Sequence, residues 1–261
     1  MNITQNIAAM PSWLSLLLVV VLPTAVTAFA LVRFRHHVAL ERLKTDIEVT
    51  SFTFATISVV YAVLLGFAVL VVWEKYHDAG GAVMKEAGAA AALYRLSDGL
   101  GAEAGAALRA KLTAYLKSAT GDDWREMQHG GSSENTTRAL TDIYSTVLSD
   151  IASHGRDSAV LNEIFDQLNL ITEARRDRNA LAAGAVPGII WVVLIAGGIM
   201  TVGSAFFFTS QNLFAQVVMT GMLSVIVCLA ILAVVSISYP FTGPVSVTPA
   251  PLIELLGDFG G

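Results

Sequence analysis

The chain has 261 residues, of which 54% are hydrophobic and only 14% are charged, and its net charge is -5. A soluble domain carries about 25% charged residues, so this deficit indicates a membrane protein. The acidic balance and the lack of a tract of lysine and arginine argue against nucleic acid as a partner. No Lys or Arg precedes the first apolar stretch, which is therefore predicted to be a retained span rather than a signal peptide.

Four apolar stretches reach the length of about 20 residues that a helix needs to cross a bilayer. They cover residues 12–34, 52–73, 186–208 and 213–239. The sequence therefore predicts an all-α, polytopic membrane protein with four transmembrane helices. Residues 1–73 hold the first two, and residues 185–239 form a transmembrane hairpin, because only four residues join the last two spans.

Small residues recur at helical spacing in the spans. Lipid gives no hydrophobic drive for helix association, so small residues that allow close backbone approach favour packing. We expect helix-packing positions at Gly66 in the second span, at Gly197, Thr201 and Ala205 in the third, and at Thr220 and Ser224 in the fourth.

Residues 74–184 are polar and are predicted to form a soluble helical bundle inserted between the second and third spans. Apolar residues at i, i+3 and i+4 predict four helices, near residues 74–98, 103–119, 134–152 and 157–183. The first and the last of these are predicted to be continuous with the adjoining spans, because no strong break separates them from the membrane. The carboxylates of this segment are interpreted as solvated surface residues.

Residues 240–261 form a tail with several prolines and glycines. Thr248 and Pro249 predict the start of a short amphipathic helix near residues 250–256. Its apolar face, Leu252, Leu255 and Leu256, is expected to pack on the protein or to lie at the membrane interface.

The distribution of basic residues bears on orientation. Loop 35–51 is short and carries Arg35, Arg42 and Lys44, and short basic loops tend to stay in the cytoplasm. This count favours a multi-pass protein of the cell membrane with the bundle on the outer side.

Two Glu-x-x-His pairs, Glu74 with His77 and Glu126 with His129, have the spacing found in di-metal helical bundles. We keep a metal site at these four residues as an alternative to the favoured interpretation, in which they are solvated or interfacial. No phosphate-binding loop, dinucleotide fingerprint or nucleophile elbow occurs. Enzyme chemistry is therefore not indicated, and no catalytic residue or cofactor is assigned.

The second, third and fourth spans contain no Asp, Glu, Lys, Arg or His. Pumps and coupled transporters place such residues in their spans, so this absence argues against both. A passive pore needs no buried charge, because a hydrophobic constriction can gate it by dewetting. Val59, Val63 and Phe67 lie four residues apart on the second span and are the candidate pore-lining residues, with packing against neighbouring helices as the alternative.

Segments of the sequence resemble a known family. The matching residues are 61–67 (YAVLLGF), Glu86–Ala87, Leu93–Tyr94–Arg95, Trp124 and 240–247 (PFTGPVSV, without its Pro244). They resemble the bacterial bestrophin-like membrane family, whose function is undefined. The Leu-Gly-Phe step followed by Trp73 and Tyr76 also resembles, more distantly, the pore helix of bestrophin anion channels.

Bestrophins are pentameric chloride channels with a cytosolic helical domain. The resemblance implies a homo-oligomer, a small anion as the permeating species, a neck at Val59, Val63 and Phe67, and a cytoplasmic bundle, opposite to the charge count. Four spans per chain are too few for a pore, so a channel requires several copies, with a pentamer suggested by analogy. The alternative is a non-conducting sensor or scaffold whose bundle binds a partner.

Overall fold

The computed structural model describes residues 3–37, 47–154, 158–184, 186–207 and 212–259. Within these ranges every regular element is helical, and the elements divide into two units. One unit, Asn2–Glu74 and Ala185–Ser238, holds the four apolar helices and is called the membrane unit here. The other, Lys75–Gly184 and Tyr239–Gly261, is called the extramembrane unit, after the expectation from its polar sequence. Most of loop 35–51 and the turn before Asn212 fall outside the described residues.

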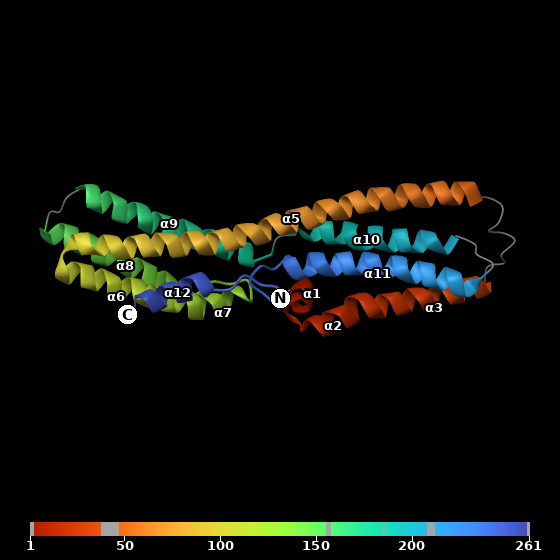
Figure 1. Cartoon of the computed structure of the whole chain (residues 1–261), viewed down its shortest axis with the longest axis horizontal. Coiled ribbons are helices and arrows are strands. Elements are labelled where there is room, and N and C mark those ends of the chain that lie inside the picture. The colour runs from red at the N-terminus through yellow and green to blue at the C-terminus, as the bar shows by residue number, and fades with distance from the viewer. Residues whose placement is uncertain (1–2, 38–46, 155–157, 185, 208–211, 260–261) are drawn as a thin grey trace. The chain divides into compact units, whose positions relative to one another are not determined.

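The membrane unit holds four helices that are long and apolar enough to cross a bilayer, as predicted (Figure 1). The first span consists of α2 (Ser12–Leu16), a π-helical turn (Leu17–Val21) and α3 (Leu22–His37), and it follows the short helix α1 (Ile3–Ala9). The others are the first part of α5 (Ile47–Leu96), α10 (Gly188–Ser204) with a 3-10 turn (Ala205–Phe207), and α11 (Leu213–Ile237).

The extramembrane unit is built from the remainder of α5, α6 (Ala102–Ser118), α7 (Trp124–Met127), α8 (Glu134–His154), α9 (Ser158–Ala182) and α12 (Ala250–Asp258). A 3-10 turn (Ser97–Leu100) links α5 to α6, and a π-helical stretch (Ala119–Asp123) links α6 to α7. Between the predicted helices 103–119 and 134–152 the chain therefore stays helical as far as Met127.

One of the two predicted continuous helices is present. Helix α5 runs for 50 residues without interruption, and Gly80 and Gly81 lie within it. The prediction for α9 is wrong, since α9 ends at Ala182 and α10 begins at Gly188. Gly184 takes a positive φ of 106°, the usual way to end a helix. Pro187 then precedes α10 with an extended backbone (ψ 145°), which helical geometry does not allow.

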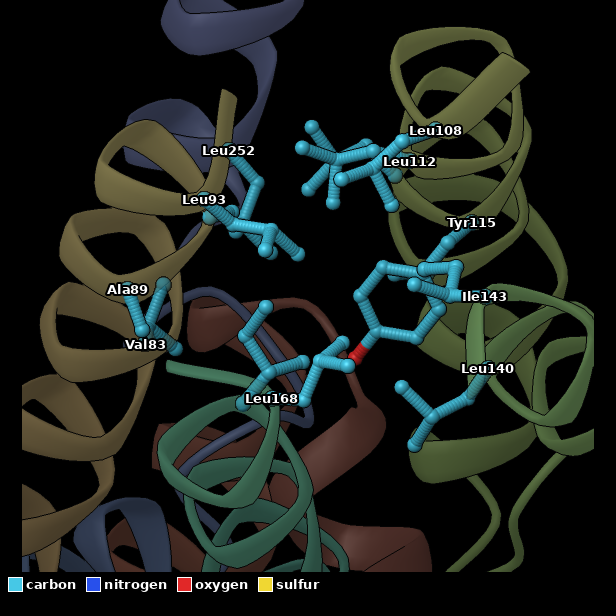
Figure 2. Close-up of a cluster of buried hydrophobic side chains, with 14 of the residues drawn as sticks. Val83, Ala89, Leu93, Leu108, Leu112, Tyr115, Leu140, Ile143, Leu168 and Leu252 are labelled. Carbon is cyan, nitrogen blue, oxygen red and sulfur yellow. The ribbon is translucent and has the colours of Figure 1, made fainter. Parts of the chain in front are cut away.

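The core of the extramembrane unit includes apolar side chains from six helices, α5 to α9 and α12. Figure 2 shows Leu108, Leu112 and Tyr115 of α6 directed toward the same interior as Leu93 of α5 and Leu168 of α9. Helix α12 completes this core, because Leu252 is fully buried and the Phe259 ring, just after the helix, stacks on Tyr94 with centroids 3.7 Å apart. The tail helix therefore packs on the protein, which decides between the two alternatives left open by its sequence.

Two of the small-residue positions contact helices other than their neighbour in the transmembrane hairpin. A Cβ on Gly197 would lie 2.6 Å from the Tyr61 ring, so α10 packs there against α5. The Tyr61 hydroxyl donates to the Leu194 carbonyl at 3.2 Å, which holds the ring in place. On α11, the Ser224 hydroxyl lies 3.3 Å from that of Thr24 on α3. The stripe on α11 thus contacts the first span at Ser224, rather than only its hairpin partner.

Of the other predicted packing positions, three are buried and one is open. Thr201, Ala205 and Thr220 are buried, whereas a Cβ on Gly66 would meet no atom within 4 Å. Gly66 therefore lies on a face of α5 that the described part of the chain leaves open.

Candidate functional site

The candidate pore-lining residues form an exposed apolar row on the membrane part of α5. The exposed fractions are 63% for Val59, 52% for Val63 and 63% for Phe67. Helix α5 buries a different face, which includes Tyr61, Ala68 and Val72, against the rest of the membrane unit. The row thus faces away from the other spans of the chain.

Phe67 also borders an apolar groove of about 310 Å³ between α5 and α10. The walls are aliphatic, with Leu64, Ala68 and Val71 on α5 opposite Ile190 and Val193 on α10. Substitutions at Phe67 therefore change two surfaces at once, the exposed row and the edge of this groove.

The residues of the metal-site alternative do not form a site. Glu74, His77, Glu126 and His129 are all exposed. Among the residues that the structure describes, these four included, no group of three or more His, Cys, Asp or Glu side chains could hold a metal ion. The His129 Nδ1 instead lies 3.0 Å from the Arg125 carbonyl of its own turn.

A buried charge network, which was not predicted from the sequence, lies at the centre of the extramembrane unit. Arg178 of α9 is fully buried, and its guanidinium donates from Nε to Glu86 Oε2 at 2.8 Å and from Nη2 to Glu86 Oε1 at 3.1 Å. The same Nη2 donates to Asp123 Oδ2 at 3.1 Å. The Tyr115 hydroxyl donates to Glu86 Oε1 at 2.6 Å. Helices α5, α6 and α9 are thus joined at the Glu86 carboxylate, which accepts from both Tyr115 and Arg178.

Asp123 is the second buried acid of this network. Its carboxylate accepts from Arg175 Nε and Nη2, both at 3.0 Å, as well as from Arg178. It also accepts from the backbone N–H of Ser133 at 2.8 Å, just before α8 begins. The π-helical stretch that ends at Asp123 has an extra residue per turn relative to the α-helix, and such stretches are frequent at functional positions.

The network is electrically balanced and its members satisfy one another. Two carboxylates, Glu86 and Asp123, face two guanidinium groups, Arg175 and Arg178, so no net charge is buried. Desolvation would lower the pKa of Arg178, but the charges of Glu86 and Asp123 outweigh it, and the pKa is raised. The interpretation of the carboxylates in residues 74–184 as solvated is therefore wrong for Glu86 and Asp123, both of which are fully buried.

Alkaline pH is expected to destabilise the extramembrane unit through Tyr115. Burial, and then the Glu86 charge, raises the pKa of this phenol well above its ordinary value. The unfolded chain therefore loses the Tyr115 proton near pH 10 while the folded chain keeps it. The titration of Tyr115 thus leaves the free energy of unfolding unchanged below about pH 10 and lowers it by roughly 1.4 kcal/mol per pH unit above that pH. Urea unfolding at about pH 9 and about pH 11 measures this loss.

The matched variant is Tyr115→Phe, which removes the titrating proton and one hydrogen bond to Glu86. It should be less stable than the wild type at neutral pH but lose less stability between the two pH values. An equal loss in both proteins would contradict the assignment to Tyr115.

Part of this network could have been found from the sequence. On α9 the buried apolar residues Leu168 and Ile171 continue at helical spacing into Arg175 and Arg178 and then Ala182. On α5, Glu86 falls in the same register as the buried residues Val83, Ala90 and Leu93. A charge on a core register predicts a buried partner, because an unpaired charge is too costly to bury. Asp123 gives no such signal, since it lies in the π-helical stretch.

Comparisons with known proteins identify the family. The sequence model of the Bestrophin-like domain matches residues 19–252, which is most of the chain. The chain belongs to the bestrophin-like family. No curated protein sequence matched it significantly.

Solved structures share the fold of this bestrophin-like chain. A tryptophan-to-alanine variant of a bacterial Bestrophin homolog from Klebsiella pneumoniae is 16% identical, with 96% of this chain and 97% of that one aligned at a TM-score of 0.76. A tyrosine-to-alanine variant is 15% identical over 94% and 97%, with a TM-score of 0.74. The homolog phased on zinc is 16% identical over 94% and 98%, with a TM-score of 0.72. At these identities the likeness establishes the fold alone.

Several residues that carry the bestrophin-like resemblance meet at the buried charge network. Glu86 is one of its two acids, and the Trp124 ring lies 5.2 Å from the Arg178 guanidinium carbon. Phe241 packs edge-on against Trp124 with centroids 5.4 Å apart. The Thr242 hydroxyl donates to the Gln128 carbonyl at 3.0 Å. Segments far apart in the sequence thus share one structural role, the enclosure of the network.

Proposed function

We propose that this bestrophin-like protein is a homo-oligomeric, passive anion channel in which the membrane part of α5 lines the pore. The observation that carries the proposal is the exposed row of Val59, Val63 and Phe67 on an uncharged span. An apolar row that several copies direct at a common axis would form a neck that controls the entry of water and ions.

Two features support this proposal over other transport mechanisms. The last three spans carry no ionisable residue of the kind on which pumps and coupled transporters depend. Four spans cannot enclose a conduit within one chain, and the row lies on the outside of the protomer, so a pore requires neighbouring copies. Chloride as the permeating ion, and five as the number of copies, rest on the resemblance to bestrophins.

Reconstitution in liposomes tests the proposal. Purified full-length protein is expected to pass chloride above the leak of empty vesicles, with native mass spectrometry giving the number of copies. Absence of chloride flux at every pH and calcium level tried would reject the channel. A particle in which the α5 helices do not surround a common axis would favour the alternative, a sensor or scaffold.

The resemblance to bestrophins also supports a cytoplasmic position for the extramembrane unit, against the count of basic residues. Green fluorescent protein fused to the C-terminus matures in the cytoplasm, so fluorescence of such a fusion in bacterial cells is expected. A dark fusion that is present in the membrane would place the unit on the outer side.

A further inference from the structure

A polar groove of about 380 Å³ lies between α8 and α9 in the extramembrane unit, and nothing in the proposed channel function uses it. Pockets that take small molecules span about 300–1,000 Å³, so the groove is large enough for a small organic ligand. Its lining residues come from both helices and include no carboxylate: Thr137, Leu140, Thr141, Tyr144, Thr172, Arg175, Arg176 and Asn179.

The threonine hydroxyls of the groove are available as acceptors. Thr137, Thr141 and Thr172 each donate their proton to the carbonyl four residues earlier, at 3.1, 3.0 and 2.8 Å. A hydroxyl has one proton and two lone pairs, so these groups have no proton left to offer a ligand. Asn179 adds an acceptor, because its Oδ1 is buried and has no hydrogen-bond partner within the described part of the chain.

Two arginines provide the donors of the groove. Arg175 is 8% exposed, and four of its five N–H groups are used, by Asp123 twice, by Ser133 O and by Thr137 Oγ1. The fifth is on Nη1, beside the lining residue Thr137. Arg176 is exposed, and no hydrogen bond or ion pair to it occurs among the described residues. The charge of Arg175 is balanced by Asp123, which leaves Arg176 as the uncompensated cation.

We propose that this groove binds a small hydroxylated carboxylate. The carboxylate would pair with Arg176 and the free N–H of Arg175, since charge-assisted contacts of this kind are the strong ones. The hydroxyls of the ligand would donate to Thr141 and to the unpartnered Asn179 Oδ1, and Leu140 would contact its carbon chain. An ammonium group suits these acceptors less well, because the groove has no carboxylate to balance its charge and lies beside two arginines.

Calorimetric titration of the full-length protein in detergent tests the proposal, with D-gluconate as the probe. Sorbitol carries the hydroxyls without the charge, acetate carries the charge without the hydroxyls, and serine carries an ammonium group. Gluconate is expected to bind at least about tenfold more tightly than each of these, a difference of about 1.4 kcal/mol.

Variants locate the site. Arg176→Gln should weaken gluconate binding about tenfold, and Thr141→Val should weaken it about threefold, because each removes one contact to the ligand. Both positions are exposed, so an unchanged urea midpoint should show that the fold is kept. The control is Arg138→Gln, an exposed arginine of α8 that contacts Glu134 and Asn135 and does not line the groove.

Three results would contradict the proposal. One is the absence of heat with gluconate up to about 10 mM at two temperatures, since that concentration would fill most of a site with a Kd of about 1 mM. Others are gluconate binding that Arg176→Gln leaves unchanged, and sorbitol, acetate or serine binding as tightly as gluconate. Chloride flux plays no part in this test, so its outcome is independent of the channel proposal.

Discussion

Replacement of Arg178 by methionine is expected to lower the free energy of unfolding of the extramembrane unit by about 3–5 kcal/mol. The substitution keeps the volume of the side chain but leaves Glu86 and part of Asp123 without their cation. Both carboxylates are fully buried, so water cannot replace the lost contacts. The purified protein in mild detergent, unfolded with urea and followed by near-ultraviolet circular dichroism, gives the measurement.

The control for this prediction is Arg176→Met, on the same helix two residues away. Arg176 is exposed and lies outside the network, so its loss should change stability by no more than about 0.5 kcal/mol.

A double variant separates the buried charge from simple loss of packing. Adding Glu86→Gln to Arg178→Met removes the unpaired negative charge. The free energy of unfolding of the double variant should therefore fall by at least about 1 kcal/mol less than the sum of the two single losses. Strict additivity of the two substitutions would contradict the claim that the ion pair, rather than the packing around it, holds these helices together.

Replacement of Phe67 by alanine is expected to raise chloride flux into liposomes about tenfold, as a fall of about 1.4 kcal/mol in the barrier would produce. The side chain is 63% exposed and ends the apolar row on α5. A smaller residue at a dewetting constriction widens it and shortens its apolar length, so water and ions cross more readily.

Val69→Ala is the control, because Val69 is also exposed on α5 but lies on another face of the helix. It should leave the flux within about twofold of the wild type, a change of roughly 0.4 kcal/mol in the barrier. Equal increases in both variants would show that the effect is not specific to the apolar row of Val59, Val63 and Phe67. No change in the Phe67 variant would remove this residue from the conduction path.

The membrane part of the structure could be predicted because it depends on local composition. A stretch of about 20 apolar residues has to be helical in a bilayer, since every backbone polar group must be satisfied within the segment. The four spans and the helices α6, α8 and α9 follow from such runs and from apolar periodicity, and the uninterrupted course of α5 follows from the lack of a strong break. The end of α9 at Ala182 is not predicted, because Pro187 is compatible with a kink in a continuous helix as well as with the first turn of a new one.

Which helices pack against each other could not be predicted, because this depends on where segments distant in the sequence meet. Gly197 and Ser224 were expected at contacts between helices, but only the tertiary structure pairs Gly197 with Tyr61 and Ser224 with Thr24. The same holds for the tail, whose apolar face suited either the membrane interface or the protein core until Leu252 was found buried in the extramembrane unit.

By itself the sequence determined the class of the protein, its four spans, its inserted helical unit and its family, since apolar length, periodicity and local motifs are properties of neighbouring residues. The tertiary structure alone decided that Glu86, Asp123, Arg175 and Arg178 form one buried set, and that α8 and α9 enclose a polar groove. Charged residues can be buried only where partners from distant segments converge on them, and that convergence is a property of the folded chain.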